Sequence, residues 1–285
     1  MDKDILSEIA EQYPTFSKRQ RAIANYIKEN YDKAAFMTAG RLGSVIGVSE
    51  STVVRFAADM GYDGYPSMRK ALQDMIRSRL TSVQRIQVAK SLINDNDILR
   101  YVISADIEKL QATVAENNES SFDAAVDAII AAKNVYIVGM RTSTALSQFL
   151  GYYLSLLREG VHVVHNTEAS DVYEQLIRVE PEDLFIDISF PRYTSQSASA
   201  IRYVRAKNVR TLAITDCEAS PLCEYADLRL FAKSDMVSFL DSLVAPLSLI
   251  NAIIVAVGTR LGGDATEIFD RLEHIWTEHG VYEHN

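Results

Sequence analysis

The stretch LFIDISFPRYTSQSASAIRY, Leu184–Tyr203, runs from an apolar segment through a proline turn into a segment rich in hydroxyl side chains. Its first part, LFIDIS, is a short apolar run of the kind that forms a strand buried on both faces. Pro191–Thr194 predict a turn, and SQSASAIRYVRA predicts a helix that starts directly after it. A strand, a short turn and a helix in this order are the repeating unit of an α/β domain.

The same alternation continues on both sides of this stretch. The other predicted strands are NVYIVG (134–139), VHVVH (161–165), VRTLAIT (209–215) and DLRLF (227–231), and helices are expected to begin near Thr142, Glu168, Thr194 and Ser220. Apolar strands that alternate with helices indicate a parallel sheet covered on both faces. Residues 106–285 are therefore predicted to form an α/β domain with a doubly wound parallel sheet.

The N-terminal region has a different pattern. Residues 1–77 contain helical spacing of apolar residues only, in DILSEIAEQY, SKRQRAIANYIKENY, AGRLGSVIG, ESTVVRFAADM and SMRKALQDMIRSRL. Residues 78–105 are more polar and include NDND, which is typical of a joint between domains. The sequence thus predicts an all-α domain over 1–77, a helical linker over 78–105 and the α/β domain over 106–285, in keeping with a length of 285 residues.

Charge is distributed unevenly between these regions. The whole chain carries a net charge of −9, but residues 1–90 hold 14 Lys and Arg against 10 Asp and Glu, a net of +4. The remaining residues hold 15 against 28, a net of −13. A basic module joined to an acidic one is typical of a nucleic-acid-binding domain linked to a domain with another task.

The segment LGSVIGVSESTVVRF, Leu42–Phe56, has the spacing of a helix-turn-helix. Gly47 is placed at the turn, and Gly43 at the point where two helices cross and only a small residue fits. Ser49 is expected to cap the second helix, because serine is a favoured N-cap residue. Arg55 lies on the outer face of that helix, where it can reach guanine or a phosphate in DNA.

The predicted contacts with DNA combine residues of the second helix with basic residues near it. They are Ser49, Ser51, Thr52, Arg55, Lys18, Arg19 and Arg41. The alternative is an ordinary helical hairpin in which Arg55 is a solvated charge. The apolar seam, the small residue at the crossing, the glycine turn and the basic local charge together favour the DNA-binding interpretation.

Hydroxyl side chains follow three of the predicted strands. At the carboxyl ends of parallel strands, free backbone N–H groups and helix dipoles attract anions. The predicted effector site accordingly contains Thr142, Ser143, Ser189, Thr194, Ser195 and Ser220, with Glu168 as a hydrogen-bonding partner for sugar hydroxyls. The alternative is that each Ser or Thr only caps its own helix. Three such loops together favour a site for a phosphate or a sugar.

At these residues the sequence resembles the RpiR family of bacterial transcriptional regulators, in which a helix-turn-helix precedes a sugar isomerase (SIS) domain. The resemblance rests on GVSESTVVRFAADMGYDGYPSMRKAL (47–72), VYIVGMRTST (135–144), ISFPRYTSQSASA (188–200) and AITDCEASPLCEYAD (213–227). It implies that Ser143, Ser189, Thr194 and Ser195 hold the phosphate of a sugar-phosphate effector, and that Ser220 lies in a loop that helps to close the site. It also implies a homodimer or homotetramer assembled through the SIS domains.

One departure from the family pattern concerns charge. Many SIS domains have GxGxS after the first strand, whereas this chain reads Gly139, Met140, Arg141, Thr142, Ser143. With Arg192 in FPRYT, Arg141 leads to the hypothesis of a more acidic ligand, such as a sugar acid or a ligand with a second phosphate. The alternative is that both arginines pair with acidic side chains at the rim of the site.

Two other functions remain open at this stage. The first is a sugar-phosphate isomerase with an accessory helical domain, which requires a positioned acid and base, and the second is an acidic half that serves oligomerisation alone. We expect no catalysis, no cofactor, no metal site and no membrane segment, and a cytoplasmic location. The expected partners are an operator in double-stranded DNA, arranged as an inverted repeat, and a small sugar phosphate or sugar acid.

Overall fold

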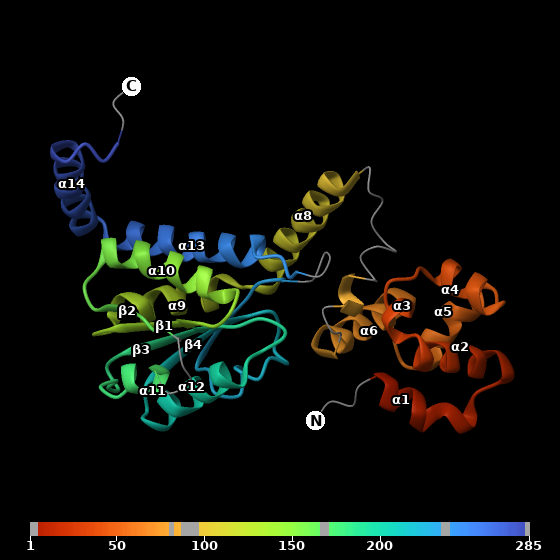
Figure 1. Cartoon of the computed structure of the whole chain (residues 1–285). Coiled ribbons are helices and arrows are strands. Elements are labelled where there is room, and N and C mark those ends of the chain that lie inside the picture. Colours follow the sequence, from red (N-terminus) through yellow and green to blue (C-terminus); the bar gives the residue numbers. More distant parts are fainter. Residues whose placement is uncertain (1–4, 80–82, 87–96, 166–170, 235–239, 283–285) are drawn as a thin grey trace. The chain divides into compact units, whose positions relative to one another are not determined.

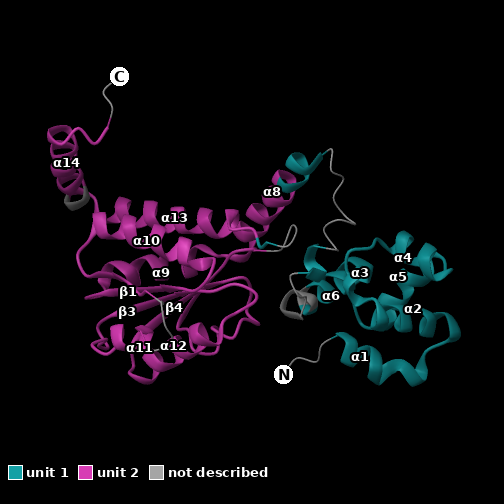
Figure 2. Cartoon of the chain, viewed as in Figure 1, with its two compact units in different colours: residues 1–102, 236–241 teal, residues 103–235, 242–285 magenta. Residues whose placement is uncertain are grey.

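A computed structural model describes residues 5–79, 83–86, 97–165, 171–234 and 240–282 of the chain (Figure 1). The chain divides into two compact units (Figure 2). One comprises residues 1–102 with 236–241, and the other comprises residues 103–235 with 242–285. Along the chain, the first division falls within helix α8 (Ile98–Glu116).

The first unit has a helical core. Its helices are α1 (Ile5–Gln12), α2 (Lys18–Glu29), α3 (Tyr31–Ala34), α4 (Ala39–Ile46), α5 (Glu50–Asp59) and α6 (Tyr65–Arg79), with a 3₁₀ turn at Tyr13–Thr15. Apolar residues from several of these helices are fully buried together, among them Ile9, Ile23, Leu42, Phe56 and Leu72. Burial of such side chains stabilises the unit by roughly 1.5–3 kcal/mol each.

Helices α4 and α5 form the predicted helix-turn-helix. Gly47 ends α4 in the left-handed conformation with φ 82°, which glycine adopts without a steric penalty. A Cβ atom at Gly43 would lie 2.7 Å from the carbonyl oxygen of Val48, so only glycine permits the close approach of the two helices. The prediction of a helix-turn-helix over Leu42–Phe56 is confirmed.

Two tyrosines hold the segment that follows α5. The Tyr65 hydroxyl donates to the carbonyl oxygen of Met37 at 3.0 Å, and the Tyr62 hydroxyl donates to Glu8 at 2.8 Å. Burial raises the pKa of Tyr65 to about 12, so the phenol stays protonated and remains a donor. One bond holds the first residue of α6 to the segment between α3 and α4, and the other holds Tyr62, which precedes α6, to α1.

The second unit contains a five-stranded parallel sheet in the order β2-β1-β3-β4-β5. The strands are β1 (Val135–Gly139), β2 (Val161–Val163), β3 (Leu184–Ile188), β4 (Arg210–Thr215) and β5 (Leu228–Phe231), and every neighbouring pair runs parallel. All residues of β1 and β3 are buried. The predicted doubly wound α/β fold is confirmed.

Helices cover both faces of this sheet (Figure 1). One face carries α9 (Glu119–Ala131), α10 (Ser143–Leu157) and α13 (Val244–Leu261), and the other carries α11 (Asp171–Gln175) and α12 (Ser195–Ala206). Leu184, Ile186 and Ile188 of β3 point into the first layer, and Phe185 points into the second. This alternation explains why the strand is apolar at every position except Asp187.

The connection after β4 differs from the prediction. A helix was expected to begin near Ser220, but residues 218–225 form a series of turns. Their hydrogen bonds span three residues, as from the Cys223 N–H to the Ser220 carbonyl at 3.0 Å. The Ser220 hydroxyl also accepts from the Leu222 N–H at 3.4 Å, a side-chain-to-backbone bond of the kind that competes with helix geometry, and from the Thr215 hydroxyl at 2.8 Å. The prediction of a helix at this point was wrong.

Helix α13 is the long apolar helix of the second unit. By length and composition it is the one helix of the described residues that can cross a membrane, and 33% of its apolar window is buried in the structure. Leu249, Ile250, Ile253 and Val257 pack into the same core as the sheet. These contacts are those of a core helix. The chain continues into α14 (Gly263–Glu278).

Candidate functional site

The outer face of α5 is a surface of small and charged residues. Glu50, Ser51, Val54, Arg55 and Ala58 line a shallow open hollow there. Val53, Phe56 and Ala57 point the opposite way and are fully buried in the helical core. The helix therefore leaves the Arg55 side chain free to meet a ligand, and across the described part of the chain this side chain has no hydrogen-bond or ion-pair partner.

Hydroxyl side chains stabilise the start of α5. The Ser49 side chain accepts a hydrogen bond from the Thr52 N–H at 3.3 Å and also contacts the Thr52 and Ser51 hydroxyls at 2.8 and 3.0 Å. Ser49 is thus the N-cap of the helix, as its sequence position predicts. Thr52 is half-buried, whereas Ser51 is exposed. Among the three, Ser51 has the freest position for contact with DNA.

The predicted phosphate contacts lie on two other helices of the same unit. Lys18 and Arg19 are in the first turn of α2, Arg41 is in α4, and all three are exposed. Arg21, nearby in α2, donates to the Pro14 carbonyl at 3.1 Å and lies over the Tyr13 ring. Exposed cations of this kind supply the salt-dependent part of DNA binding.

In the second unit, the strand order places the ends of β1 and β3 side by side. Gly139 at the end of β1 pairs with Ile188 at the end of β3. The chain leaves β1 toward one face of the sheet, through α10, and leaves β3 toward the other, through α12. In open sheets with this strand order, ligands bind in the crevice outside the carboxyl ends of the strands at such a switch point.

The loop after β1 is closely packed. A Cβ atom at Gly139 would overlap the carbonyl oxygen of Ser143, so the glycine lets α10 begin directly against the strand end. Arg141 has φ 55°, in the left-handed region that favours glycine, and its side chain is exposed. Ser143 is only 4% exposed at the first turn of α10, and Thr142 is exposed.

The loop after β3 supplies the second group of predicted residues. Ser189 is 4% exposed, and its N–H continues the sheet by donating to the Ile214 carbonyl at 3.1 Å. Thr194 caps α12 by accepting from the Ser197 N–H at 3.2 Å. Arg192 and Ser195 are exposed. Glu168, also predicted for this site, lies outside the described residues.

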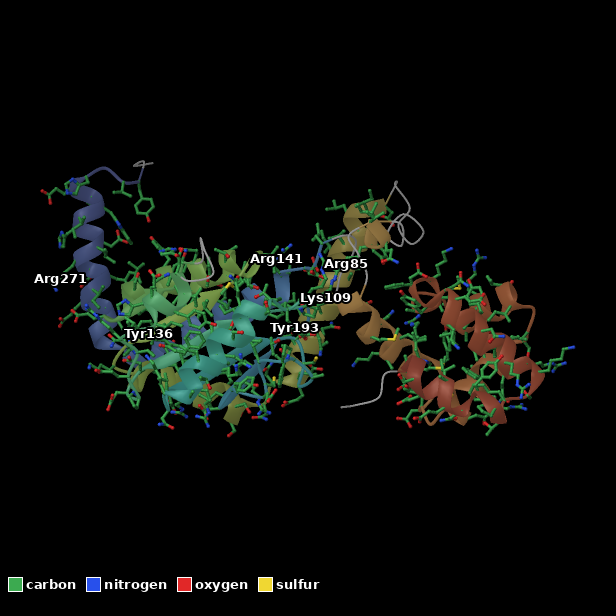
Figure 3. All side chains as sticks on the ribbon, turned by 60° about the horizontal axis from the view of Figure 1, so that its bottom comes forward. Arg85, Lys109, Tyr136, Arg141, Tyr193 and Arg271 are labelled. Atoms are coloured by element: carbon green, nitrogen blue, oxygen red, sulfur yellow. The ribbon has the colours of Figure 1, made fainter. Side chains whose placement is uncertain are left out.

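The loop after β4 is joined to the loop after β3. The Tyr193 hydroxyl donates to Oδ1 of Asp216, with 2.5 Å between the oxygens. Burial and the neighbouring Asp216 carboxylate raise the pKa of Tyr193, so the phenol stays protonated. Ser220 is 3% exposed and its oxygen is bonded to Thr215. Ser220 therefore holds its own loop in place. Figure 3 marks Tyr193 and Arg141, which come from the loops after β3 and β1.

Three residues that the sequence did not single out, Lys233, Glu116 and Thr113, extend this arrangement to α8. The Lys233 ammonium donates to the Asp216 carbonyl at 3.1 Å and forms an ion pair with Glu116 near the end of α8. The Lys233 N–H also donates to the Thr113 hydroxyl at 3.0 Å. Because 120 residues separate Lys233 from Thr113, no local sequence signal reveals the contact. Among the described residues no cluster of His, Cys, Asp and Glu has the form of a metal site.

Comparison with known proteins agrees with both units. Residues 3–79 match the model of the helix-turn-helix domain of the rpiR family, and residues 128–256 match the model of the SIS domain. The chain belongs to the RpiR family. It is a helix-turn-helix transcriptional regulator, and its second unit is a SIS domain.

Individual relatives span most of this RpiR-family chain. The HTH-type transcriptional regulator HexR of Pseudomonas aeruginosa is 23% identical over 92% of both chains. The sugar isomerase domain of an RpiR transcription factor from Sphaerobacter thermophilus is 28% identical, with a TM-score of 0.60 over 62% of this chain and 99% of that one. The Vibrio vulnificus NanR protein, solved with ManNAc-6P, is 21% identical, with a TM-score of 0.56 over 96% of this chain and 98% of that one.

The SIS fold is shared with an enzyme as well. A phosphoheptose isomerase from Francisella tularensis is 13% identical, with a TM-score of 0.51 over 59% of this chain and 100% of that one. At this identity the likeness concerns the fold alone. The function of the SIS domain in this chain therefore has to be argued from its own residues.

Proposed function

We propose that this RpiR-family regulator binds its operator through α5 and changes its affinity for DNA when a sugar phosphate or a related acidic sugar binds the SIS domain. The observation that carries the proposal is the pairing of Gly139 with Ile188, which brings two hydroxyl-bearing loops together at the switch point of the sheet. Ligand binding to one arrangement of the protein better than to another shifts the population between them.

The chemistry of these loops suits a phosphate group. Ser143 and Ser195 begin the helices α10 and α12, and the first backbone N–H groups of a helix attract anions. Ser189 adds a hydroxyl from the end of β3. The relative NanR was solved with a phosphorylated amino sugar, which supports the same ligand class here.

Arg141 and Arg192 make a more acidic ligand the preferred candidate. Both are exposed, and they lie in the loops that follow β1 and β3. Arg141 has no hydrogen-bond or ion-pair partner within the ranges that the structure describes. Guanidinium groups bind carboxylates and phosphates through paired hydrogen bonds. A sugar acid phosphate or a bisphosphate fits this charge better than a plain hexose phosphate.

Binding without catalysis is the function that these residues support. The His165 backbone is held by the Gln175 side chain on both its N–H and its carbonyl group, at 2.9 and 2.6 Å. This arrangement fixes the backbone after β2, and within the described ranges the His165 imidazole has no hydrogen-bond partner that would make it a general base. HexR, which is similar over nearly its whole length, is named as a regulator. Isomerisation of a sugar phosphate by the purified protein would overturn this part of the proposal.

A homodimer formed through the SIS domains accounts for an exposed apolar surface. Val255 of α13 is 66% exposed, Val114 of α8 is 78% exposed and Tyr152 of α10 is 58% exposed. An apolar groove lined by α8, α9 and α13, including Leu110, Phe122 and Leu249, continues this surface. Large exposed apolar surfaces mark interfaces, and a twofold dimer presents two recognition helices to an inverted repeat.

The dimer is tested by sedimentation of the full chain. Val255→Asp and Val114→Asp are expected to shift the protein toward the monomer, whereas Val45→Asp, an exposed apolar residue of the first unit, leaves the mass unchanged. If the variant that carries both substitutions is still a dimer, this surface is not the interface.

The experiment that tests the effector site is a thermal-shift screen of the full chain against sugar phosphates, amino-sugar phosphates and sugar acids, because a ligand of the folded state raises Tm. A hit that Ser143→Ala and Ser189→Ala weaken supports the site. Ser155→Ala in α10 is the matched control, because its hydroxyl bonds only to the Tyr152 carbonyl. Absence of a hit would favour a SIS domain that serves assembly alone.

The DNA-binding half is tested in parallel by selecting bound fragments from random double-stranded DNA. An inverted repeat is the expected outcome, with affinity that falls steeply as salt rises. Adding the hit from the thermal screen is expected to change the affinity for the selected DNA. If the ligand does not change the affinity for DNA, ligand binding and DNA binding are independent, and the regulatory proposal is contradicted.

A further inference from the structure

A carboxylic acid lies on β3 two residues before Ser189, in the layer between the sheet and α12. Asp187 belongs to β3 and is completely buried. Its neighbours in register are Val138 on β1 and Ala213 on β4, both apolar. Charged side chains are rarely buried to this extent unless they are paired, because removal from water penalises the charged form.

Within the described part of the chain, Asp187 has one hydrogen-bond partner. The Ser197 hydroxyl donates to Oδ1 of Asp187 at 2.5 Å, and Oδ2 has no hydrogen-bond partner among the residues that the structure describes. Burial raises the pKa of Asp187 to about 7, while the hydrogen bond from Ser197 acts in the opposite direction. The acid therefore changes its charge near neutral pH.

Two serines relate the acid to the proposed effector site: Ser189 is one of its residues, and Ser197 lies in the same helix turn as Ser195. Ser189 lies two residues along β3 and so is on the same face of the strand as Asp187. Ser197 is in the first turn of α12, where its N–H is capped by Thr194. The acid thus contacts the helix start and lies on the strand whose end holds the proposed anion.

We propose that binding of an anionic effector at Ser189 and the first turn of α12 is coupled to uptake of a proton by Asp187. The inference rests on the proposed function and deepens it by naming how that site is regulated. An anion bound in front of β3 and an ionised Asp187 behind it repel each other across a region from which water is excluded. The neutral acid removes the repulsion, so the protonated protein binds the anion more tightly.

Other charged or titratable groups on the surrounding elements do not account for the shift. They are Tyr136 on β1, Arg141 after β1, Tyr173 and Glu174 on α11, Asp183 before β3, Arg192 and Tyr193 after β3, Arg202, Tyr203 and Arg205 on α12, and Asp216 and Cys217 after β4. None of them contributes to the pKa shift of Asp187, whose causes are burial and Ser197. We assign the coupling to Asp187, and Asp187→Asn tests this assignment.

The direction of the effect follows from the two protonation states. Below about pH 6 the acid is neutral with and without ligand, so affinity is constant. As pH rises through the pKa of the free protein, the free state loses the proton that the bound state retains, and affinity falls. If anion binding raises the proton affinity of Asp187 tenfold, the affinity for the anion falls by up to about tenfold from low to high pH.

The test uses the full-chain protein with inorganic sulfate, a divalent anion that does not titrate between about pH 5.5 and 8.5. Sulfate affinity is measured over that range at constant ionic strength, and loss of binding in Ser189→Ala confirms where the ion binds. Wild type is expected to lose roughly tenfold in affinity between about pH 6 and 8.5. Asp187→Asn is expected to bind equally across the range and to match wild type at the acid end.

Two further measurements keep the test decisive if Asp187→Asn does not fold. Calorimetry in two buffers of different ionisation enthalpy is expected to show proton uptake by wild type at about pH 7. Ser197→Ala, which removes the hydrogen bond to the ionised acid, is expected to move the pH midpoint upward, whereas Ser199→Ala in the same helix leaves it in place.

The outcomes separate this inference from the proposed function. Sulfate binding without proton uptake and without pH dependence overturns the coupling and leaves the effector site standing. The same pH dependence in Asp187→Asn assigns it to another group and also overturns the inference. Failure of sulfate to bind at any pH removes the anion site itself, and the coupling with it.

Discussion

The Tyr193 hydroxyl donates a hydrogen bond to Asp216, with 2.5 Å between the oxygens, and so ties the loop after β3 to the end of β4. The Asp216 carbonyl in turn accepts from Lys233, which forms an ion pair with Glu116 of α8. These contacts connect the proposed effector loop to the helix in which the division between the two units falls. We therefore predict that these contacts take part when ligand binding changes the affinity for DNA.

Lys233→Met tests this route. The variant is expected to bind the effector within about twofold of wild type but to lose most of the effect of ligand on DNA affinity. It loses the ion pair with Glu116 and the bond to the Asp216 carbonyl, and keeps only the backbone bond to Thr113. The measurement is DNA affinity with and without ligand. Lys133→Met is the matched control, because Lys133 forms an exposed ion pair with Glu180, with side chains 62% and 56% exposed. Wild-type coupling in Lys233→Met would rule the route out.

Arg55→Ala addresses how α5 reads DNA. If Arg55 contacts a base edge, the substitution costs about 1–3 kcal/mol in specific binding and little in non-specific binding. Arg19→Ala, at an exposed position in α2, is expected to weaken both kinds of binding equally and to reduce the salt dependence. Titration of the selected operator and of unrelated DNA at several salt concentrations distinguishes the two. Equal losses in Arg55→Ala would make Arg55 a phosphate contact.

Gly43→Ala tests the crossing of α4 and α5. The new methyl group would lie 2.7 Å from the Val48 carbonyl oxygen, so the helices must move apart, at a cost of roughly 1–3 kcal/mol in the free energy of unfolding. Gly40→Ala in the same helix meets only the flexible Glu50 carboxylate at 3.1 Å and is expected to be neutral or mildly stabilising. Urea unfolding of both variants provides the comparison, and equal stabilities would show that the crossing tolerates a side chain.

Two substitutions at Arg141 separate the effect of its charge on ligand affinity from the effect of its backbone conformation on stability. Its φ of 55° favours glycine, so Arg141→Gly is expected to be about 1 kcal/mol more stable than Arg141→Ala in thermal unfolding. Both variants remove the same charge and are expected to lose a similar factor in affinity for the acidic effector, roughly 5- to 10-fold. Unchanged affinity in both would show that Arg141 does not bind the ligand.

Asp187 also predicts how stability depends on pH. Its folded-state pKa lies at about 7, above the ordinary value of 3.8, so the folded protein binds more protons than the unfolded chain between these values. Stability contributed by the buried neutral acid is present below about pH 4 and is lost as pH rises toward 7. Asp187→Asn is therefore expected to unfold at a higher urea concentration than wild type at pH 8 and to show a smaller advantage at pH 5. Parallel pH curves would show that Asp187 does not titrate in this range.

Much of the fold could be predicted because its signals are local. Apolar runs such as LFIDIS and the caps Ser49 and Thr194 act within a few residues along the chain. The same is true of Gly47 at the turn of the helix-turn-helix, since its left-handed conformation is a property of that residue. The expected helix at Ser220 was wrong: the chain forms turns there, in which the Ser220 hydroxyl accepts from the Leu222 N–H.

The candidate site depended more strongly on tertiary structure. The sequence pattern alone does not distinguish Ser189, Thr194 and Ser220, because all three are hydroxyl side chains near predicted strand ends. In the fold, Ser189 lies at the end of β3 beside β1, whereas the Ser220 hydroxyl is bonded within its own loop. Asp187 lies in the apolar run LFIDIS and was not predicted as a functional residue. Its contact with Ser197 forms only when α12 packs on β3.

The sequence by itself determined the two kinds of domain, the helix-turn-helix and the residues available for DNA and anion binding, because periodicity, capping and charge are properties of short segments. Tertiary structure alone decided which loops meet, through the strand order β2-β1-β3-β4-β5, and which polar groups are already bonded. It also decided that Asp187 is removed from water and that Lys233 joins β4 to α8. Burial and long-range contact depend on the whole packed chain, so no segment of the sequence encodes them alone.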